Sequence, residues 1–294
     1  MDKGLLRRLQ FWKSGASAKK AGLYLGVDSL TAYLAPGTDT PAVVEQFKVL
    51  EDDFDGAMKA AAEATGAVHA ALVLAPPHYQ IVTLDRPKVA NDELAPALLW
   101  AIKDLVTLSV DDIHYDYFSA PVVSSNKVNV VIVSKSWLSK VLQSAADHQI
   151  NISHVVIEEL ALTHLFSGEE SARMLLSQLP EQEMLLTVVK DGELYLQRRL
   201  RGFNQLANAQ SSELEQDVAD RLSLEVRRSM DFFESQLRQP PVSSINLLLS
   251  HQGDALQPLL NQNFNQAVEQ VPAESVAPIM ARMALMELEQ EVAS

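Results

Sequence analysis

Two short apolar segments, residues 70–75 and 245–249, constrain the fold of this chain most strongly. Each follows a helical pattern, and an apolar run of this length is typical of a buried strand. A proline pair stops the first strand, and another proline pair ends the helix that precedes the second. The two segments therefore predict two α/β blocks, one from about residue 22 to about 80 and one from about 180 onward.

The first block begins with a strand–turn–strand pattern from Gly22 to Tyr33, and a further strand spans Val43 to Val49. An alanine-rich helix from Asp53 to Ala64 follows. Gly66 is well placed to end it, because glycine readily adopts the left-handed conformation found after helix C-termini. These elements predict a small sheet covered by at least one helix.

Between the blocks, residues 81–158 predict a separate module with the order β-α-β-β-α-β, a split unit with two helices on one face of a sheet. Asn91 is a natural N-cap for the first helix, and the acidic residues behind it favour a helix start. The expected strands and helices cover residues 81–85, 91–106, 113–119, 128–134, 136–149 and 152–157.

The second block opens with strands from Met184 to Val189 and from Glu193 to Arg198. The intervening Lys190-Asp-Gly sequence is a strong hairpin signal. A long helix is expected over residues 212–238, because its apolar residues recur at steps of three and four. Two further helices are expected near residues 255–262 and 276–290.

Composition excludes several classes of protein. The 294 residues include no cysteine, which excludes disulfide scaffolds, thiol nucleophiles, thiolate zinc sites and iron–sulfur clusters. No apolar run reaches the roughly 18 residues that a membrane span needs. The N-terminus lacks the pattern of a signal peptide, so we expect a cytoplasmic protein. The net charge of −14 argues against nucleic acid as the main partner, because phosphate binding needs a basic face.

The first 20 residues differ from the acidic remainder, because they hold six basic residues and one acidic residue. Their apolar residues fall at helical spacing and predict an amphipathic helix. One interpretation is a segment that contacts an anionic membrane surface, and the other is a helix that docks on protein. The membrane-proximal candidates are Arg7, Arg8, Trp12 and Lys13.

A search for catalytic patterns is negative. The seven histidines show no metal-binding spacing, and no phosphate-binding loop or nucleophile elbow occurs. The acidic pairs Asp52-Asp53, Asp111-Asp112 and Glu158-Glu159 stand where helices or strands start or stop, which favours solvated caps. The basic side chains of residues 198–201 favour a solvated strand edge. We therefore expect no enzyme and no metal site.

Several motifs occur in a characteristic order along the chain. They are Gly22-Leu-Tyr-Leu-Gly26-Val-Asp-Ser-Leu, the segments from Asn91 to Tyr117 and from Val130 to Leu162, the hairpin from Lys190 to Arg199, and Glu225-Val-Arg-Arg-Ser-Met-Asp-Phe-Phe233 in the long helix. In this order they resemble the PilM family of type IV pilus assembly proteins, and the last is the most specific, because it resembles the family's Arg-Arg-Ser helix. More narrowly, the chain resembles the MshI-type members, the PilM-like components of mannose-sensitive haemagglutinin (MSHA) pilus biogenesis.

The resemblance implies an actin-like fold of the FtsA/PilM type, with two lobes, an inserted β-α-β-β-α-β module and a reduced second lobe. The expected organisation is a basic N-terminal segment over residues 1–20, a first lobe over 21–80 and 159–178, the inserted module over 81–158, and a second lobe over 179–294. Only about ten residues lie between Gly202 and the long helix. They are too few for the further subdomain that the family usually carries there.

In such folds ATP and magnesium lie between the lobes, held by two phosphate turns and a glycine-rich adenosine turn. In the first turn Gly26 is kept, but Tyr24 and Thr31 stand where the family has an acidic and a basic residue. The second turn, residues 178–183, lacks glycine. The third turn runs from Ser250 to Gly253 and has one glycine, Gly253, where the family has a glycine cluster. We therefore expect no cofactor, with ATP binding as the less favoured alternative.

The resemblance further implies a non-enzymatic scaffold, peripheral at the inner face of the bacterial inner membrane. It would bind the cytoplasmic tail of a PilN-like membrane protein in a groove between the first lobe and the inserted module. The expected contacts are Ile81, Glu158 and Glu159, the acidic pair being partly exposed and facing a basic residue of the tail. Self-association is a further possibility. The alternatives are an actin-like ATPase that switches the same complex and a secretion-platform protein related to the GspL cytoplasmic domain, a family that carries a transmembrane helix.

Overall fold

The computed structural model describes residues 19–37, 40–50, 53–66, 68–122, 126–272 and 275–293, with only the backbone described for residues 290–293. The described chain forms two compact units. Unit 1 comprises residues up to 119, residues 126–161 and residues from 280 onward, and unit 2 comprises residues 120–122 and 162–279 where described. The predicted N-terminal helix lies outside the described residues, apart from Lys19 and Lys20, which begin the first strand.

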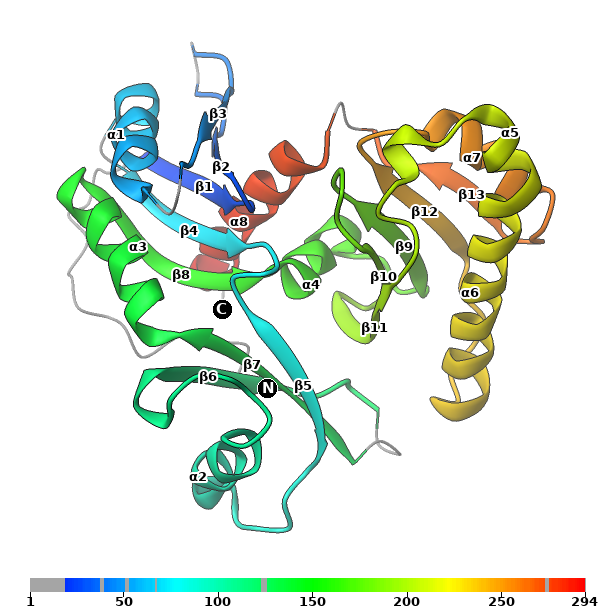
Figure 1. Cartoon of the computed structure of the whole chain (residues 1–294), viewed down its shortest axis with the longest axis horizontal. Coiled ribbons are helices and arrows are strands. Elements are labelled where there is room, and N and C mark those ends of the chain that lie inside the picture. Colours follow the sequence, from blue (N-terminus) through cyan, green and yellow to red (C-terminus); the bar gives the residue numbers. More distant parts are fainter. Residues whose placement is uncertain are drawn as a thin grey trace. The chain divides into compact units, whose positions relative to one another are not determined.

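Unit 1 is built on a five-stranded sheet (Figure 1). β1 pairs with an antiparallel neighbour on one side and with a parallel neighbour on the other. The parallel pairing continues from β4 to β8, as expected for strands buried on both faces. In sheet order the strands are β3 (Val43–Lys48), β2 (Ser29–Leu34), β1 (Lys19–Leu25), β4 (Val68–Leu74) and β8 (Ile150–Ile157).

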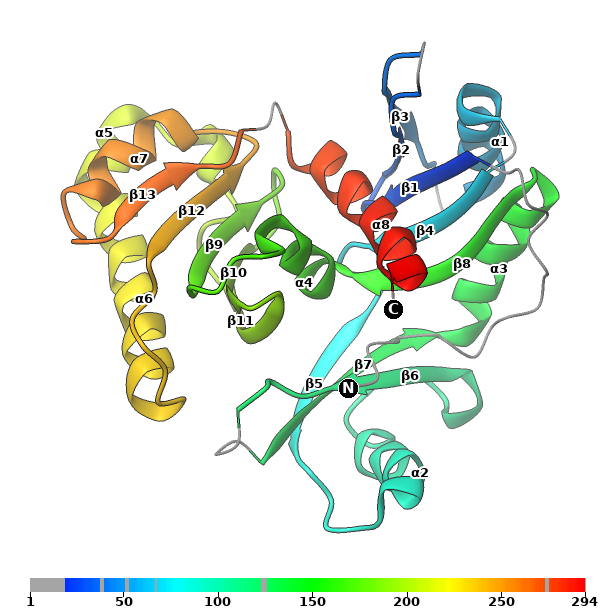
Figure 2. The ribbon, with the colours of Figure 1, turned by 180° about the vertical axis from the view of Figure 1, so that it is seen from behind.

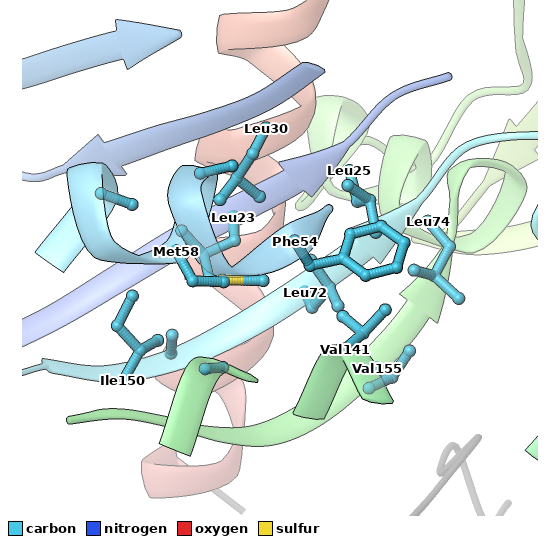
Figure 3. Packing of buried hydrophobic residues seen from close by; sticks show 14 of the residues in the cluster. Leu23, Leu25, Leu30, Phe54, Met58, Leu72, Leu74, Val141, Ile150 and Val155 are labelled. Atoms are coloured by element: carbon cyan, nitrogen blue, oxygen red, sulfur yellow. The ribbon is translucent and has the colours of Figure 1, made fainter. Parts of the chain in front are cut away.

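Two helices cover one face of this sheet, α1 (Phe54–Thr65) and α3 (Lys135–Asp147). Phe54 and Met58 of α1 and Val141 of α3 enter a core made by alternate leucines of β1 and β4 (Figure 3). Gly66 ends α1 with a φ of 80°, as the sequence predicted. The first α/β block is therefore confirmed.

The opposite face of the sheet is covered by the C-terminal part of α8 (Val276–Ala293) (Figure 2). The two elements approach so closely that a Cβ atom on Gly22 would lie 1.8 Å from the carbonyl oxygen of Ala281. Lys20 Nζ also donates to the carbonyl of Leu288, at 3.4 Å. From Met280 onward the helix belongs to unit 1, whereas the sequence assigned it to the second lobe.

The inserted module is smaller than the sequence predicted. Its sheet has only three antiparallel strands, in the order β5-β7-β6, and α2 (Asn91–Ile102) supplies the core on one face. The strands are β5 (Gln80–Asp85), β6 (Ile113–Phe118) and β7 (Lys127–Ser134), and a short 3-10 helix, Val110–Asp112, precedes β6.

The last helix and strand of the predicted module belong instead to the larger sheet. β8 pairs in parallel with β4, and α3 packs against α1 and β8. A parallel pair requires a long crossover connection, which the three-stranded insert and α3 together provide. β7 lies between two cores, because Val128, Val130 and Ile132 face α2 while Val131 and Val133 join the core of the five-stranded sheet.

Unit 2 contains a second five-stranded sheet, in which β9 pairs with β10 on one side and with β12 on the other. β9 therefore belongs to this unit, although the sequence had assigned residues 159–178 to the first lobe. The strands in order are β11 (Glu193–Leu200), β10 (Met184–Lys190), β9 (Arg173–Gln178), β12 (Ser244–Leu249) and β13 (Ala267–Gln270).

The long helix predicted over residues 212–238 is confirmed, and it packs on this sheet with α7 (Gly253–Asn261). It begins with α5 (Ser211–Glu213), and π-helical turns, Leu214–Val218 and Phe232–Gln236, flank α6 (Ala219–Asp231). Along the chain, residues 126–161 of unit 1 end with α4 (Glu158–Ala161), and unit 2 continues with the 3-10 helix Leu162–Phe166. A 3-10 turn, Leu206–Asn208, precedes α5.

Candidate functional site

The predicted first phosphate turn connects β1 and β2. The N–H of Gly26 donates to the carbonyl of Ser29 at 2.8 Å, which closes the turn. A ring nitrogen of His78 lies 2.7 Å from the carbonyl oxygen of Gly26. Both main-chain groups of Gly26 therefore already bond within the protein. A Cβ atom here would lie 3.2 Å from the Ser29 hydroxyl, so tight packing within the turn is sufficient to explain the glycine.

Tyr24, which stands in the acidic position of the first turn, is fully buried. Its hydroxyl donates to Oε1 of Glu158 at 2.7 Å. A neutral phenol that already donates to a carboxylate is a poor magnesium ligand, because Mg²⁺ prefers carboxylate oxygens and waters. Thr31 is also buried, and its hydroxyl has no hydrogen-bonding partner among the described residues.

The second turn connects β9 and β10 and is closed by a side chain. The amide Nε2 of Gln178 donates to the carbonyls of Gln182 at 2.8 Å and Phe203 at 2.7 Å. Glu181 adopts a φ of 63°, a conformation that glycine occupies without strain. This turn is therefore held by Gln178 and presents carboxylates where a phosphate would need donors.

The third turn, between β12 and α7, is packed against the second. The N–H of Ser250 donates to the carbonyl of Gln178 at 3.3 Å, and Gln252 adopts a φ of 63°. A Cβ atom on Gly253 would lie 3.0 Å from Oε1 of Gln270, so this glycine serves close packing. Gly26 belongs to unit 1, whereas Ser250 and Gly253 belong to unit 2.

The prediction that Glu158 and Glu159 are partly exposed is wrong. They are 2% and 1% exposed, and they begin α4 directly after β8. Each accepts a hydrogen bond from a tyrosine hydroxyl, Glu158 from Tyr24 and Glu159 from Tyr79, both at 2.7 Å. Buried carboxylates need such partners, so this pair stabilises the interior and does not offer a surface contact. Ile81 is half-buried and packs against the core of the five-stranded sheet.

Unit 1 contains a small cavity between its two sheets, of about 10 Å³. This is near the minimum volume for one water molecule and far below the roughly 300–1,000 Å³ of small-molecule sites. Most of its walls are apolar, and α3 contributes Leu138. The other lining residues are Leu74 of β4, His114, Tyr115 and Asp116 of β6, Val131 and Val133 of β7, and Val155, Val156 and Ile157 of β8.

The edges of two strands border this cavity. Residues 114–116 of β6 and 155–157 of β8 are consecutive, and successive side chains of a strand point to opposite faces. Three consecutive residues therefore border one cavity only along the edge of their strand. β6 and β8 are each the outermost strand of their sheet, so over the described residues neither outer edge carries another strand.

Polar groups surround the β6 side of the cavity. Asp112 accepts hydrogen bonds from the Ser134 hydroxyl and the Ser136 N–H, both at 2.7 Å, and these bonds lower the pKa of its carboxyl group. Burial, aided by the Lys135 ammonium, lowers the pKa of His114 from its usual 6.5. Burial also raises the pKa of Tyr115. Sequence reasoning missed His114, although its place in a strand of alternating polar and aromatic residues was a usable signal.

The motif from Glu225 to Phe233 is engaged within unit 2. Arg198 of β11 donates to Glu225 at 3.0 Å and to the Ser229 hydroxyl at 2.8 Å. Arg228 donates to the same Glu225 at 2.6 Å, and Arg227 donates to the carbonyl of Asn263 at 2.9 Å. These bonds attach the helix to the sheet and to the segment after α7. The sequence predicted a solvated side chain for Arg198, whereas in the structure it bonds β11 to the long helix.

No group of three or more histidine or acidic side chains among the described residues is placed to hold a metal ion. Among the same residues, no helix has both the length and the apolar character that crossing a membrane requires.

Comparison with protein-family models finds no match, and comparison with curated protein sequences finds none either. Solved structures do match. A chain of the PilM–PilN type IV pilus biogenesis complex is 14% identical with a TM-score of 0.62, and the match covers 92% of this chain and 98% of that one. The cytoplasmic domain of EpsL, an inner-membrane component of the type II secretion system of Vibrio cholerae, is 14% identical with a TM-score of 0.56, over 92% and 95%.

A protein of unknown function from Bacteroides thetaiotaomicron with an actin-like ATPase fold also matches. It is 12% identical with a TM-score of 0.51, and the match covers 90% of this chain and 95% of that one. At such low identity these likenesses establish the fold. The chain has the actin-like fold of the PilM type, as its sequence predicted.

Proposed function

We propose that this protein is a non-enzymatic scaffold of a type IV pilus assembly platform, of the MshI type that serves MSHA pili. It lies at the cytoplasmic face of the inner membrane and binds the cytoplasmic tail of a PilN-like membrane protein. The fold supports the general role, because a structure with the same fold is part of a PilM–PilN complex. The sequence motifs favour the narrower MshI assignment.

The cavity between β6 and β8 carries this proposal. A short tail that is disordered when free must recover its ordering cost through backbone bonds and buried apolar contacts. Over the described residues the outer edges of β6 and β8 carry no other strand, so a tail could pair with them, and the buried side chains of Val133, Val155 and Val156 form the apolar wall of the cavity. Because the cavity is small, the tail lies extended along the edges and only a small group reaches inside.

This site replaces the acidic pair of the sequence prediction. Asp116 borders the cavity and is half-buried, whereas Glu158 and Glu159 are buried. Oδ1 of Asp116 accepts from the N–H of Tyr117 at 2.7 Å, which holds the carboxylate beside the strand edge. Asp116 is therefore the carboxylate that borders the cavity, and it also has partners within the protein.

The proposed lack of enzymatic activity is supported by the three turns. One side chain in each turn already bonds within the protein. The Tyr24 hydroxyl donates to Glu158, the Gln178 amide donates to the carbonyl of Phe203, and the Gln252 amide donates to the carbonyl of Ala209 at 3.0 Å. Phosphate binding would require several main-chain donors and a metal ligand at these places. In this proposal the turns serve packing.

The test is calorimetry with synthetic peptides of the cytoplasmic tails of PilN-like proteins, using the full chain. We expect one tail to bind at one site, and a scrambled tail to bind no better than background. A second tail peptide, N-methylated at alternate residues, should bind at least tenfold more weakly, because it cannot bond both strand edges. Failure of every tail to bind would contradict the proposed function, and equal binding of the methylated tail would contradict the extended mode.

The likeness to EpsL favours a second candidate, a scaffold of a type II secretion platform. The same calorimetry separates the two, if tails of secretion-platform membrane proteins are measured beside the pilus tails. Preference for a secretion tail by more than about tenfold would reverse our assignment.

A further inference from the structure

Nε2 of His114 is a buried polar atom in the wall of the cavity, and it has no hydrogen-bonding partner among the described residues. Most of the other side chains that line the cavity are aliphatic. A buried ring nitrogen without a partner is unusual, because nearly all buried polar atoms in native proteins are hydrogen-bonded. Apolar packing does not explain this atom, which needs a polar partner in the cavity: a water molecule, or a polar group of a ligand that displaces it.

The neighbouring polar groups on the same strand are already occupied. The Tyr115 hydroxyl donates to the carbonyl of Ala95 at 2.7 Å, and Asp116 accepts from the N–H of Tyr117. Asp112 is held by Ser134 and Ser136. Lys135 stands close enough to help lower the pKa of His114 and carries no acceptor for its ring. No neighbour on β6 or α3 is thus arranged to satisfy Nε2.

The state of the imidazole follows from its surroundings. Burial and the Lys135 ammonium disfavour the charged form, so His114 is neutral near pH 7. In a neutral imidazole one ring nitrogen donates and the other accepts. A peptide group carries both an N–H donor and a C=O acceptor, so it satisfies Nε2 in either tautomer.

We propose that His114 is the polar recognition residue of the cavity, and that its Nε2 hydrogen-bonds a main-chain amide group of the bound tail. This inference rests on the proposed tail binding and specifies how the tail is placed. The hydrogen bond fixes the position of the extended segment along the edges of β6 and β8. Apolar contacts alone would allow the segment to slide by two residues, because strand side chains repeat with that period.

The experiment compares tail binding by the full chain with two substitutions at one position. His114→Phe keeps the ring and removes the polar atom, and should weaken binding about tenfold or more, as loss of a buried hydrogen bond predicts. His114→Gln keeps a side chain that can donate and accept, and should stay within about threefold of the original affinity. The matched control is His251→Phe, at an exposed histidine of unit 2, which should leave binding unchanged.

A second measurement reports on His114 without any substitution. The ¹⁵N resonance of Nε2 should shift on addition of the tail peptide, and the shift should saturate at the calorimetric stoichiometry. If the tail binds but His114→Phe keeps full affinity and the resonance does not move, the inference is overturned and the proposed function stands. If no tail binds the unsubstituted protein, the proposed function falls, and this inference falls with it.

Discussion

At the scale of single residues, the bond between Tyr24 and Glu158 decides how the first turn is interpreted. The pair couples the middle strand of the sheet to the helix that follows β8. A tyrosine in place of an acidic residue is visible in the sequence, but its bond to a residue 134 positions away is not. The sequence favoured solvated caps for all acidic pairs, because acidic residues at a helix start are usually exposed.

Replacing Tyr24 with phenylalanine should lower the free energy of unfolding by about 1.5–3 kcal/mol, the usual value of a hydrogen bond to a charged group. The change removes only the hydroxyl, so the carboxylate of Glu158 loses one buried donor. Urea unfolding monitored by circular dichroism measures it. Tyr33→Phe on the neighbouring strand is the control and should cost less than about 0.5 kcal/mol. Equal effects of the two substitutions would contradict our interpretation of Tyr24.

The lowered pKa of His114 predicts how the free energy of unfolding depends on pH. Its pKa in the folded protein lies below the usual 6.5, so the unfolded chain takes up this proton first as the pH falls. The free energy of unfolding should therefore decrease below about pH 6.5 and level off below the folded pKa. His114→Phe removes this contribution, so its stability relative to the unsubstituted protein should rise as the pH falls from 7 to 5.

Asp112 affects the free energy of unfolding in a separate and lower pH range. Its folded pKa lies below 3.8, so its contribution is present above that pH and is lost as the pH falls through the folded pKa. Urea titrations at pH 7, 6 and 5 therefore isolate His114 from Asp112. A difference between the His114 variant and the unsubstituted protein that does not change with pH would show that the histidine titrates normally.

At the scale of secondary-structure elements, the sequence predicted most helices and strands, missed β9 and β13, and assigned some elements to the wrong sheet. α3 and β8 were expected in the inserted module because they follow β7 directly. Periodicity shows how a strand is buried, and it carries no information on which neighbour pairs with it. The run from Val155 to Ile157 is buried whether it joins the insert or lies beside β4, so only the tertiary structure distinguishes the two.

Alanine substitutions at two glycines should change the free energy of unfolding in opposite directions. Gly22→Ala places a Cβ atom against the backbone of α8, so we expect a loss of about 1–3 kcal/mol or more, together with faster hydrogen exchange in α8. Gly56→Ala lies in α1, where the nearest atom to a Cβ is 3.9 Å away. It should stabilise by about 0.5–1 kcal/mol, because alanine is the better helix former. Two changes of the same sign would contradict the described packing of α8.

At the scale of the whole molecule, the actin-like fold was predictable because motifs in both units occur in family order. The structure of the three turns that would bind a nucleotide was only partly predictable. Missing glycines and acidic residues could be read from the sequence, whereas the closure of the second turn by Gln178 required the structure. The predicted N-terminal helix lies outside the described residues and stays a prediction.

Nucleotide binding can be tested on the full chain by thermal unfolding. If the turns serve packing as proposed, millimolar ATP with magnesium should leave the melting temperature unchanged within error. A ligand at a hundred times its dissociation constant would add about 2.7 kcal/mol of stability, which is a shift of several degrees. A shift of that size that disappears when magnesium is chelated would support the ATPase alternative.

The packing of α8 on β1 also bears on how the protein is made. Lys20 and Leu288, which join the two elements, are 268 positions apart, and every other described element is synthesised between them. Protein synthesis adds about 5–20 residues per second, so α8 is completed roughly 10–50 seconds after the strand that it covers. During that interval the nascent chain exposes the surface around Gly22, and a chain that stops early exposes it permanently. A truncated copy that ends before Met280 therefore lacks the described cover of one face of this sheet.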